Sequence, residues 1–301
     1  MTEARNDSAT DPLLDPRGSG SGEGGIRGCY DASPYLSIKH ATYFGVYDDL
    51  LASYRGRPIT FVEIGVLNGG SLHMWRRFLG AEARIIGVDL NPAAARWEAD
   101  GFEIVIGDQG EPAFWEQFFA AVGPIDVLLD DGGHTNRQQV VTAVSALPHV
   151  RDGGLLIVED VHASYQPEFG NPARHSFMRF ALQVAEWLQS RFPGVPSPQS
   201  ATGRLVRDTV HRVLFHESIV SFHVDRSRCV INSPTTNHGT TLDAADFRLR
   251  DARSAWLRRV AGEHGPLRRI PLVGAFIRRL SPHVHRWRQR RETAALARYF
   301  A

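Results

Sequence analysis

The sequence is poor in cysteine and lysine and contains no long apolar run. Its 301 residues include two cysteines, Cys29 and Cys229, which are too few for a disulfide scaffold and show no Cys-x-x-Cys metal spacing. A reducing, cytosolic setting is therefore the default expectation. No stretch approaches the roughly 20 apolar residues of a membrane span, and the polar N-terminus MTEARNDSATDP lacks the apolar core of a signal peptide.

A net charge near zero hides two oppositely charged regions. The whole chain carries +1, but the segment from Arg248 onward holds 14 arginines against three acids, about +11, so residues 1–247 carry about −10. Residues 241–301 interleave arginine pairs with Trp, Phe and Leu and predict a basic amphipathic helical tail. Its role stays open between a packing or oligomerisation segment, peripheral contact of 247–301 with an anionic membrane and nucleic-acid binding, which no RNA-binding motif supports.

Strand-like and helix-like segments alternate along the chain after a leader, residues 1–32, that is predicted to be disordered because it is rich in Gly, Ser, Asp and Pro. The runs IDVLLD and GLLIVED are nearly continuous apolar, as in strands buried on both faces of a parallel sheet. Repeated strand–helix units predict a doubly wound, mostly parallel α/β domain over 33–240. Strands are expected at 59–64, 84–89, 103–106, 125–130 and 155–159, helices at 39–54, 71–79, 92–99, 112–122, 135–147 and 173–191, and a C-terminal β-hairpin of 218–224 with 228–233.

An acidic residue stands at the end of every strand in the predicted parallel sheet. Random surface charge does not predict this regularity. Ligands of open α/β sheets bind at the carboxyl ends of the strands, near the point where the strand order reverses. The sequence therefore predicts a ligand site at this edge. The acids are Glu63, Asp89, Asp108, the pair Asp130 and Asp131, and the pair Glu159 and Asp160.

A glycine-rich loop joins the first strand to the next helix, from Gly65 to Ser71. Glycine allows positive φ and close approach of the backbone to a ligand. The loop has neither the G-x-G-x-x-G spacing of a dinucleotide site nor the G-K-[ST] of a P-loop, which disfavours a pyrophosphate ligand. Glu63 before it suits a cationic group, and Asp89 can accept hydrogen bonds from two ribose hydroxyls. The alternative is a simple glycine turn with Ser71 as a helix cap.

Two acid pairs end what should be neighbouring strands. Adjacent strands lie about 4.8 Å apart, so Asp130-Asp131 and Glu159-Asp160 can share one site. Side chains alternate in direction along a strand, so Asp130 can face a cofactor while Asp131 faces another ligand. Crowded carboxylates need a cation or raised pKa values, and oxygen ligands without cysteine indicate Mg²⁺ or Ca²⁺ rather than zinc. Helix-capping or solvated acid pairs are the alternative.

His134 follows the first acid pair. Thr135 and Gln138 form the sequence pattern of a capping box, so a helix should begin directly after the histidine. A helix N-terminus disfavours a cationic imidazolium, which helps to keep His134 neutral, as a general base requires. A purely structural histidine is the alternative.

Three of these segments resemble the motifs of class I S-adenosylmethionine-dependent methyltransferases: EIGVLNGGS the first, GVDLNP the second and GDQ the third, within roughly residues 36–192. The resemblance implies that the glycine loop wraps the methionine part, that Asp89 holds the ribose, and that Asp108 and Gln109 lie near the adenine. The full candidate set for cofactor binding is Glu63, Gly65, Asn68, Gly69, Ser71, Asp89, Asp108, Gln109 and Asp130.

The patterns DDGGH and VED resemble a narrower group, the metal-dependent sugar O-methyltransferases of macrolide glycosides and relatives associated with cephalosporin biosynthesis. The resemblance implies that Asp131, Glu159 and Asp160 bind Mg²⁺ and that His134 is the catalytic base. Gly133 stands where serine is common in that group.

The sequence thus predicts a Mg²⁺-dependent O-methyltransferase that acts on a sugar hydroxyl of a glycoside, polysaccharide or glycolipid. A phenol or catechol O-methyltransferase and an RNA methyltransferase using the basic tail stay as alternatives. A homo-oligomer is expected, in the cytoplasm or at a membrane. Residues 161–177, with Tyr165 and His175, are a candidate substrate lid or an ordinary loop. Residues 36–47, with Lys39, are a second candidate for closing the cofactor site.

Overall fold

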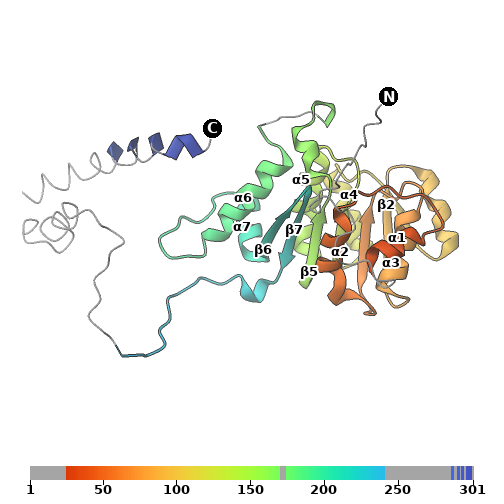
Figure 1. Cartoon of the computed structure of the whole chain (residues 1–301), viewed down its shortest axis with the longest axis horizontal. Coiled ribbons are helices and arrows are strands. Elements are labelled where there is room, and N and C mark those ends of the chain that lie inside the picture. Colours follow the sequence, from red (N-terminus) through yellow and green to blue (C-terminus); the bar gives the residue numbers. More distant parts are fainter. Residues whose placement is uncertain are drawn as a thin grey trace, which may run out of the picture. The chain divides into compact units, whose positions relative to one another are not determined.

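A seven-stranded sheet forms the centre of the first of two units into which the chain divides, residues 1–234 and 235–301 (Figure 1). The computed structural model describes residues 25–169 and 174–240, with isolated positions between 286 and 299. The strand order is β3-β2-β1-β4-β5-β7-β6. The parallel strands are β1 (Thr60–Ile64), β2 (Arg84–Asp89), β3 (Glu103–Ile106), β4 (Ile125–Asp130) and β5 (Val150–Val158), and the antiparallel ones are β6 (Val210–His216) and β7 (Ile219–Val224).

The order reverses between β1 and β4, because β2 and β3 lie on one side of β1 while β4 and β5 lie on the other. In an open α/β sheet this reversal leaves a crevice at the carboxyl ends of the two central strands. The doubly wound, mostly parallel fold predicted from the sequence is therefore confirmed. The edge of the sheet at which the sequence predicts a ligand site coincides with this crevice.

Helices cover both faces of the sheet. The apolar residues of β1 alternate between two cores, since Phe61 packs into one and Val62 into the other. Burying one large apolar side chain contributes about 1.5–3 kcal/mol, so strands covered on both faces are strongly held. The first core includes α1 (Ile26–Asp31), α2 (Tyr43–Leu51) and α3 (Gly70–Leu79), and the second includes α4 (Pro112–Val122), α5 (Asn136–Ala146), α6 (Phe177–Gln189) and α7 (Ala201–Thr209).

The predicted hairpin has a different partner strand. β7 pairs with β6, which precedes it, and the turn lies at Glu217 and Ser218, where Ser218 has a φ of 60°. Residues 226–228 form a short 3-10 helix, and Val230 and Ile231 beyond it are 56% and 66% exposed. β6 was overlooked because His and Arg interrupt its apolar residues. The pairing of 218–224 with 228–233 was thus wrong.

The predicted leader also ends earlier than residue 32. Residues 26–31 form α1, whose Ile26 and Cys29 are buried in the first core. Six residues are too few to show helical periodicity, so composition alone could not find this helix. Residues 1–24 lie outside the described residues, as does most of the predicted tail, 241–301. No helix in the described ranges combines the length and apolar character that crossing a membrane requires.

Candidate active site

A cavity of about 580 Å³ opens at the carboxyl ends of the five parallel strands. It lies where the sequence places the ligand edge. The predicted site residues in its wall are Gly65, Asn68, Asp89, Asp108, Gln109, Asp131, His134 and Asp160. Ile38, from the segment 36–47 that is predicted to close the cofactor site, also lines it, as does Leu90, which sequence reasoning missed; they are 71% and 65% exposed. Leu90 follows Asp89 directly, so an apolar residue just beyond the strand was the available signal.

The glycine loop needs its glycines for steric reasons. Gly65 has a φ of 90°, and a Cβ there would lie 2.1 Å from the carbonyl oxygen of Asp131. Gly69 has a φ of 74°, and a Cβ there would overlap the indole of Trp97 at 2.4 Å. The loop therefore packs directly against the turn after β4, which brings the two halves of the wall together.

Asp89, at the end of β2, is hydrogen-bonded to the backbone of this loop. Its Oδ2 accepts hydrogen bonds from the backbone N–H groups of Val66 at 2.9 Å and Leu67 at 3.1 Å, and its Oδ1 accepts from Asn91 N–H at 2.8 Å. A carboxylate has about four acceptor positions. Asp89 thus retains acceptor capacity toward the cavity while three backbone donors fix its orientation.

Several predicted residues support the wall instead of lining it. Glu63 is fully buried and accepts hydrogen bonds from Ser71 Oγ and Trp75 Nε1, both at 2.8 Å, so it ties β1 to α3. Burial raises the pKa of Glu63 to about 7. Glu63 and Ser71 are thus bonded to each other outside the cavity wall, and their contact with a ligand stays a prediction.

Asp130 has a similar supporting place below the turn after β4. Its Oδ1 accepts from Gln109 Nε2 at 2.8 Å and from Gly132 N–H at 3.2 Å, while Gln109 Oε1 accepts from Gly133 N–H at 3.0 Å. Burial raises the pKa of Asp130 to about 6. Gln109 thus links the third motif to the DDGGH turn, and only Gln109 of this pair reaches the cavity wall.

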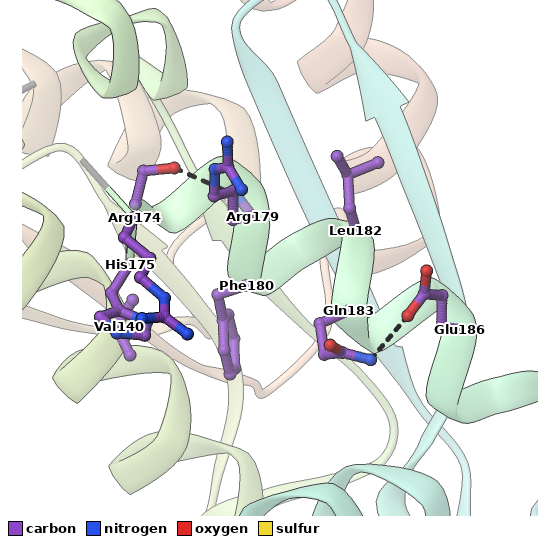
Figure 2. Close-up of a pocket in the computed structure, with 9 residues that line it drawn as sticks. Val140, Arg174, His175, Arg179, Phe180, Leu182, Gln183 and Glu186 are labelled. Carbon is purple, nitrogen blue, oxygen red and sulfur yellow. Dashed lines mark hydrogen bonds between the residues drawn. The ribbon is translucent and has the colours of Figure 1, made fainter. Parts of the chain in front are cut away.

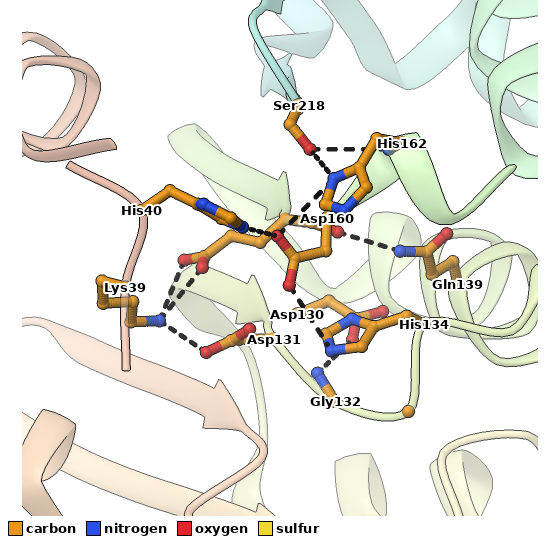
Figure 3. Close-up of polar contacts among 12 residues, drawn as sticks. Lys39, His40, Asp130, Asp131, Gly132, His134, Gln139, Asp160, His162 and Ser218 are labelled. Carbon is orange, nitrogen blue, oxygen red and sulfur yellow. Dashed lines mark hydrogen bonds and ion pairs between the residues drawn. The ribbon is translucent and has the colours of Figure 1, made fainter. Parts of the chain in front are cut away.

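A buried lysine lies inside the acid cluster (Figure 3). Lys39 Nζ donates to Asp131 Oδ2 at 2.6 Å and to Glu159 Oε2 at 3.0 Å, and its side chain is 1% exposed. Tyr47 OH donates to Glu159 Oε1 at 2.5 Å. Burial, and then the charge of Asp131, raise the pKa of Glu159 to about 8. Both carboxyl oxygens of Glu159 are thus hydrogen-bonded, one to Lys39 and the other to Tyr47.

Asp160 faces a different set of groups. It has a φ of 53°, and its carboxylate lies among three imidazoles: Oδ2 is 3.6 Å from His134 Nε2, while Oδ1 is 3.8 Å from His40 Nε2 and 3.9 Å from His162 Nδ1 (Figure 3). Tyr43 OH also donates to Asp160 Oδ1. The left-handed backbone at Asp160 turns its side chain away from that of Glu159.

The donor set fits a divalent cation. Asp131, His134 and Asp160 each offer a ligand atom within 4.8 Å of the other two, and His40, Asp160 and His162 form a second such group. Glu159 belongs to neither group within the described residues. Carboxylate oxygens suit Mg²⁺ and imidazoles suit transition metals. Of the predicted metal ligands, Asp131 and Asp160 thus lie together, while Glu159 is held by Lys39.

His134 stands at the start of α5, as predicted. The capping box is present, with Gln138 N–H donating to Thr135 Oγ1 and Thr135 N–H donating to Gln138 Oε1, both at 3.3 Å. His134 has a φ of 58°, and its Nδ1 is buried with no hydrogen-bond partner in the described part of the chain. Its Nε2 points toward Asp160 at the cavity wall, where a base could meet a substrate hydroxyl.

A second cavity, of about 490 Å³, lies beside α6 (Figure 2). It is lined by Arg174, His175, Arg179, Phe180 and Glu186 among others. His175 of the predicted lid 161–177 therefore lines this cavity and not the first. Tyr165, at the end of the 3-10 helix Val161–Tyr165, is 64% exposed. Residues 170–173 lie outside the described residues, and a lid role for this segment stays a prediction.

The comparisons with known proteins agree with the fold and the site. Residues 62–161, from β1 to just beyond β5, match the family model of a methyltransferase domain. The glycine loop, Asp89 and the two acid pairs all fall inside the matched residues, which agrees with the resemblance to methyltransferases found in the sequence.

Two curated relatives of this region are named as O-methyltransferases, one of a rhamnosyl tetracenomycin and one of mycinamicin VI. The domain is 40% identical over 149 residues to the 8-demethyl-8-alpha-L-rhamnosyl tetracenomycin-C 2'-O-methyltransferase of Streptomyces olivaceus, which covers 44% of this chain and 39% of that protein. It is 32% identical over 168 residues to the mycinamicin VI 2''-O-methyltransferase of Micromonospora griseorubida, covering 49% and 41%. The matches thus span about two fifths of these relatives' length.

A solved structure of similar fold is the MycE methyltransferase of the mycinamycin biosynthetic pathway, in complex with Mg and SAH. The superposition has a TM-score of 0.58 and 25% sequence identity, and covers 67% of this chain and 52% of that one. This likeness confirms the Rossmann-like class I fold of the methyltransferase domain.

Proposed function

We propose that the chain is an S-adenosylmethionine-dependent O-methyltransferase that methylates a sugar hydroxyl of a glycoside, with Mg²⁺ as a second cofactor. The observation that carries the proposal is one cavity with two chemically different ends. The glycine loop and Asp89 form one end, and Asp131, His134 and Asp160 form the other. Sugar-modifying relatives with 40% and 32% identity support the acceptor class.

The first end would hold the cofactor. The remaining acceptor capacity of Asp89 suits a ribose hydroxyl, and the loop from Gly65 to Gly69 brings backbone close to the methionine part. Leu90 and Ile38 offer exposed apolar surface to a flat base. Asp108 stands in the same wall, just after β3, and its Oδ1 accepts a hydrogen bond from Gly110 N–H at 2.7 Å. The adenine would bind beside it.

The second end would activate the acceptor. A sugar hydroxyl is a weak nucleophile at neutral pH, and a bound Mg²⁺ would lower its pKa as a Lewis acid. Asp131 and Asp160 would hold that ion. His134 would accept the hydroxyl proton at Nε2. Asp160 Oδ2, 3.6 Å from that nitrogen, would stabilise the imidazolium formed.

The proposed activity is tested by methyl transfer to chosen acceptors. Purified protein is incubated with S-adenosylmethionine, Mg²⁺ and a panel of rhamnosyl and related glycosides, with catechol as the comparison acceptor, and products are identified by mass spectrometry. We expect methylation of a glycoside hydroxyl that is lost with EDTA. Methylation of catechol and of no glycoside would contradict the sugar assignment and favour the phenol alternative.

The assembly and location stay proposals. We propose a homo-oligomer acting in the cytoplasm, and retain contact of 247–301 with anionic membranes as the open role of the basic tail. Sedimentation with anionic vesicles at low and high salt tests it, since screening weakens charge-driven binding. Salt-dependent RNA binding in the same buffers would favour the RNA alternative.

A further inference from the structure

The one lysine of the sequence lies at the centre of the acid cluster. The chain has 34 Lys and Arg residues together, and Lys39 is the only lysine. Its Nζ joins Asp131, which belongs to a potential cation group with His134 and Asp160, to Glu159, which does not. These contacts link positions 92 and 120 residues apart in the sequence.

The contacts of Lys39 occupy the carboxylates that an ion would need. Lys39 and Tyr47 use both oxygens of Glu159, whose side chain is fully buried, and Lys39 also takes Oδ2 of Asp131. Burial alone would lower the pKa of Lys39, but the charges of Asp131 and Glu159 outweigh it and raise the pKa. An ammonium that donates to two carboxylates and has no acceptor atom is unsuited to act as a base.

We propose that the Lys39 ammonium is a resident cation of this site, and that it competes with a divalent ion for Asp131 and Glu159. The inference rests on the divalent site of the proposed function. With Lys39 in place, an ion can use Asp131 Oδ1 and Asp160. With Lys39 displaced, Glu159 joins them. Lys39 is thus a positioning residue that weakens metal binding and keeps the ion exchangeable.

Two neighbours of Lys39 extend this link to the rest of the site. Ile38 lines the cofactor cavity, and His40 Nε2 is 3.8 Å from Asp160 Oδ1. Three consecutive residues therefore contact the cofactor end, the Asp131–Glu159 pair and the Asp160 group. If metal binding displaces Lys39, Ile38 and His40 should therefore move as well, at the two ends of the cavity.

Removing the charge of Lys39 tests the competition. The affinity for Mn²⁺ is measured by electron paramagnetic resonance on the whole chain, in wild type and Lys39→Met. We expect the variant to bind Mn²⁺ at least tenfold more tightly, because buried Glu159 and the partly exposed Asp131 lose their only nearby ammonium among the described residues. Unchanged or weaker binding by folded Lys39→Met would overturn the proposal.

Two further variants separate charge competition from a structural effect. Lys39→Met/Glu159→Gln removes the competing ammonium together with the carboxyl group that it would release, and should return the Mn²⁺ affinity to within about threefold of wild type. Arg84→Met removes a surface cation that pairs with Glu103 at the starts of β2 and β3, the opposite end of the strands from the site, and should leave the affinity unchanged. A double variant as tight as Lys39→Met would show that Glu159 is not the ligand released, which contradicts the proposal.

A measurement on the unmutated protein covers the case in which Lys39→Met fails to fold. Lysine labelled with ¹³C at Cε gives one side-chain signal, since the chain has one lysine. Saturating Mg²⁺ should shift or broaden that signal, and an unchanged signal with Mg²⁺ bound by calorimetry would overturn the proposal. If Mg²⁺ shifts the signal but no methyl transfer is detected, the result would contradict the proposed function and leave the proposal about Lys39 intact.

Discussion

The two ends of the cavity are built in different ways. At the cofactor end, Asp89 is oriented by three backbone N–H groups within 23 residues of it, and Gly65 and Gly69 fit close against their neighbours. At the acceptor end, buried acids crowd together and are balanced by Lys39 from a distant segment. The first end is set by local backbone geometry, and the second by long-range charge pairing.

The difference explains which end tolerates change. Backbone hydrogen bonds hold the cofactor end in one shape, so steric changes there should abolish binding. Charges at the acceptor end are balanced among several groups, so single substitutions should redistribute proton or metal affinity while leaving the shape intact.

The largest effect is expected at His134. His134→Gln should lower kcat by roughly 10²–10⁴-fold, the usual contribution of a general base, while leaving S-adenosylhomocysteine affinity within about twofold, because cofactor contacts lie at the other end of the cavity. Steady-state kinetics and calorimetry measure the two quantities. His238→Gln, at an exposed position, is the control. A loss of cofactor affinity equal to the loss of kcat would contradict the division of the cavity into a cofactor end and an acceptor end.

A methyl group at Gly65 should close the cofactor end. Gly65→Ala places Cβ 2.1 Å from the Asp131 carbonyl at a φ of 90°, so we expect S-adenosylhomocysteine binding to fall at least 100-fold by calorimetry. Gly123→Ala is the matched control, because its φ is 77° but nothing lies within 4 Å of the added Cβ. Equal losses in both variants would mean that backbone strain alone, and not the contact with Asp131, is responsible.

Asp89→Asn should weaken cofactor binding by an intermediate amount. The amide keeps the shape but removes the charge that strengthens the bonds from Val66 and Leu67, and charge-assisted bonds contribute about 1.5–3 kcal/mol each. We expect a 10- to 100-fold rise in Kd for S-adenosylhomocysteine. Glu116→Gln on the exposed part of α4 is the control. An unchanged Kd would remove Asp89 from the cofactor site.

The pH dependence of stability should report Glu63. Burial raises its pKa to about 7 from an ordinary 4.5, so between these values the folded chain holds a proton that the unfolded chain has released, and stability falls as pH rises. The span corresponds to about 3 kcal/mol. Urea unfolding at pH 5 and pH 8 should therefore show wild type losing stability relative to Glu63→Gln. Parallel behaviour of the two would contradict an ionising, buried Glu63.

The smallest effect is expected at His40, which is 63% exposed. His40→Ala should change Mg²⁺ affinity by less than about threefold, because Mg²⁺ prefers oxygen ligands, but should weaken Zn²⁺ binding more, because imidazole suits zinc. Competition calorimetry with the two ions measures both. A larger loss for Mg²⁺ than for Zn²⁺ would contradict the assignment of Asp131 and Asp160 as its main ligands.

The sequence predicted best those features that depend on local signals. β2, β3 and β4 have the predicted bounds, because their apolar runs stop sharply at acids and glycines. The capping box of Thr135 and Gln138 is local as well, and it was found. The hairpin was misplaced because the polar side chains of β6 concealed a strand.

The arrangement of the acid pairs could not be read from local sequence. Alternation along a strand suggested that neighbouring acids face opposite ways, but the left-handed turn at Asp160 and the pairing of Glu159 with Lys39 depend on tertiary contacts. Tyr43 and Tyr47 lie four residues apart on α2 and therefore share a helix face. That spacing was a signal that one face of α2 contacts the acids, as the hydrogen bonds from the two tyrosines to Asp160 and Glu159 show.

The most direct test of the account is calorimetry with S-adenosylhomocysteine and Mg²⁺ on wild type and Asp131→Ala. The account predicts that both proteins bind S-adenosylhomocysteine and that only the wild type binds Mg²⁺ with measurable heat. Cofactor binding without any Mg²⁺ binding by the wild type would contradict the metal-assisted mechanism. Absence of S-adenosylhomocysteine binding by well-folded wild type would contradict the central claim itself.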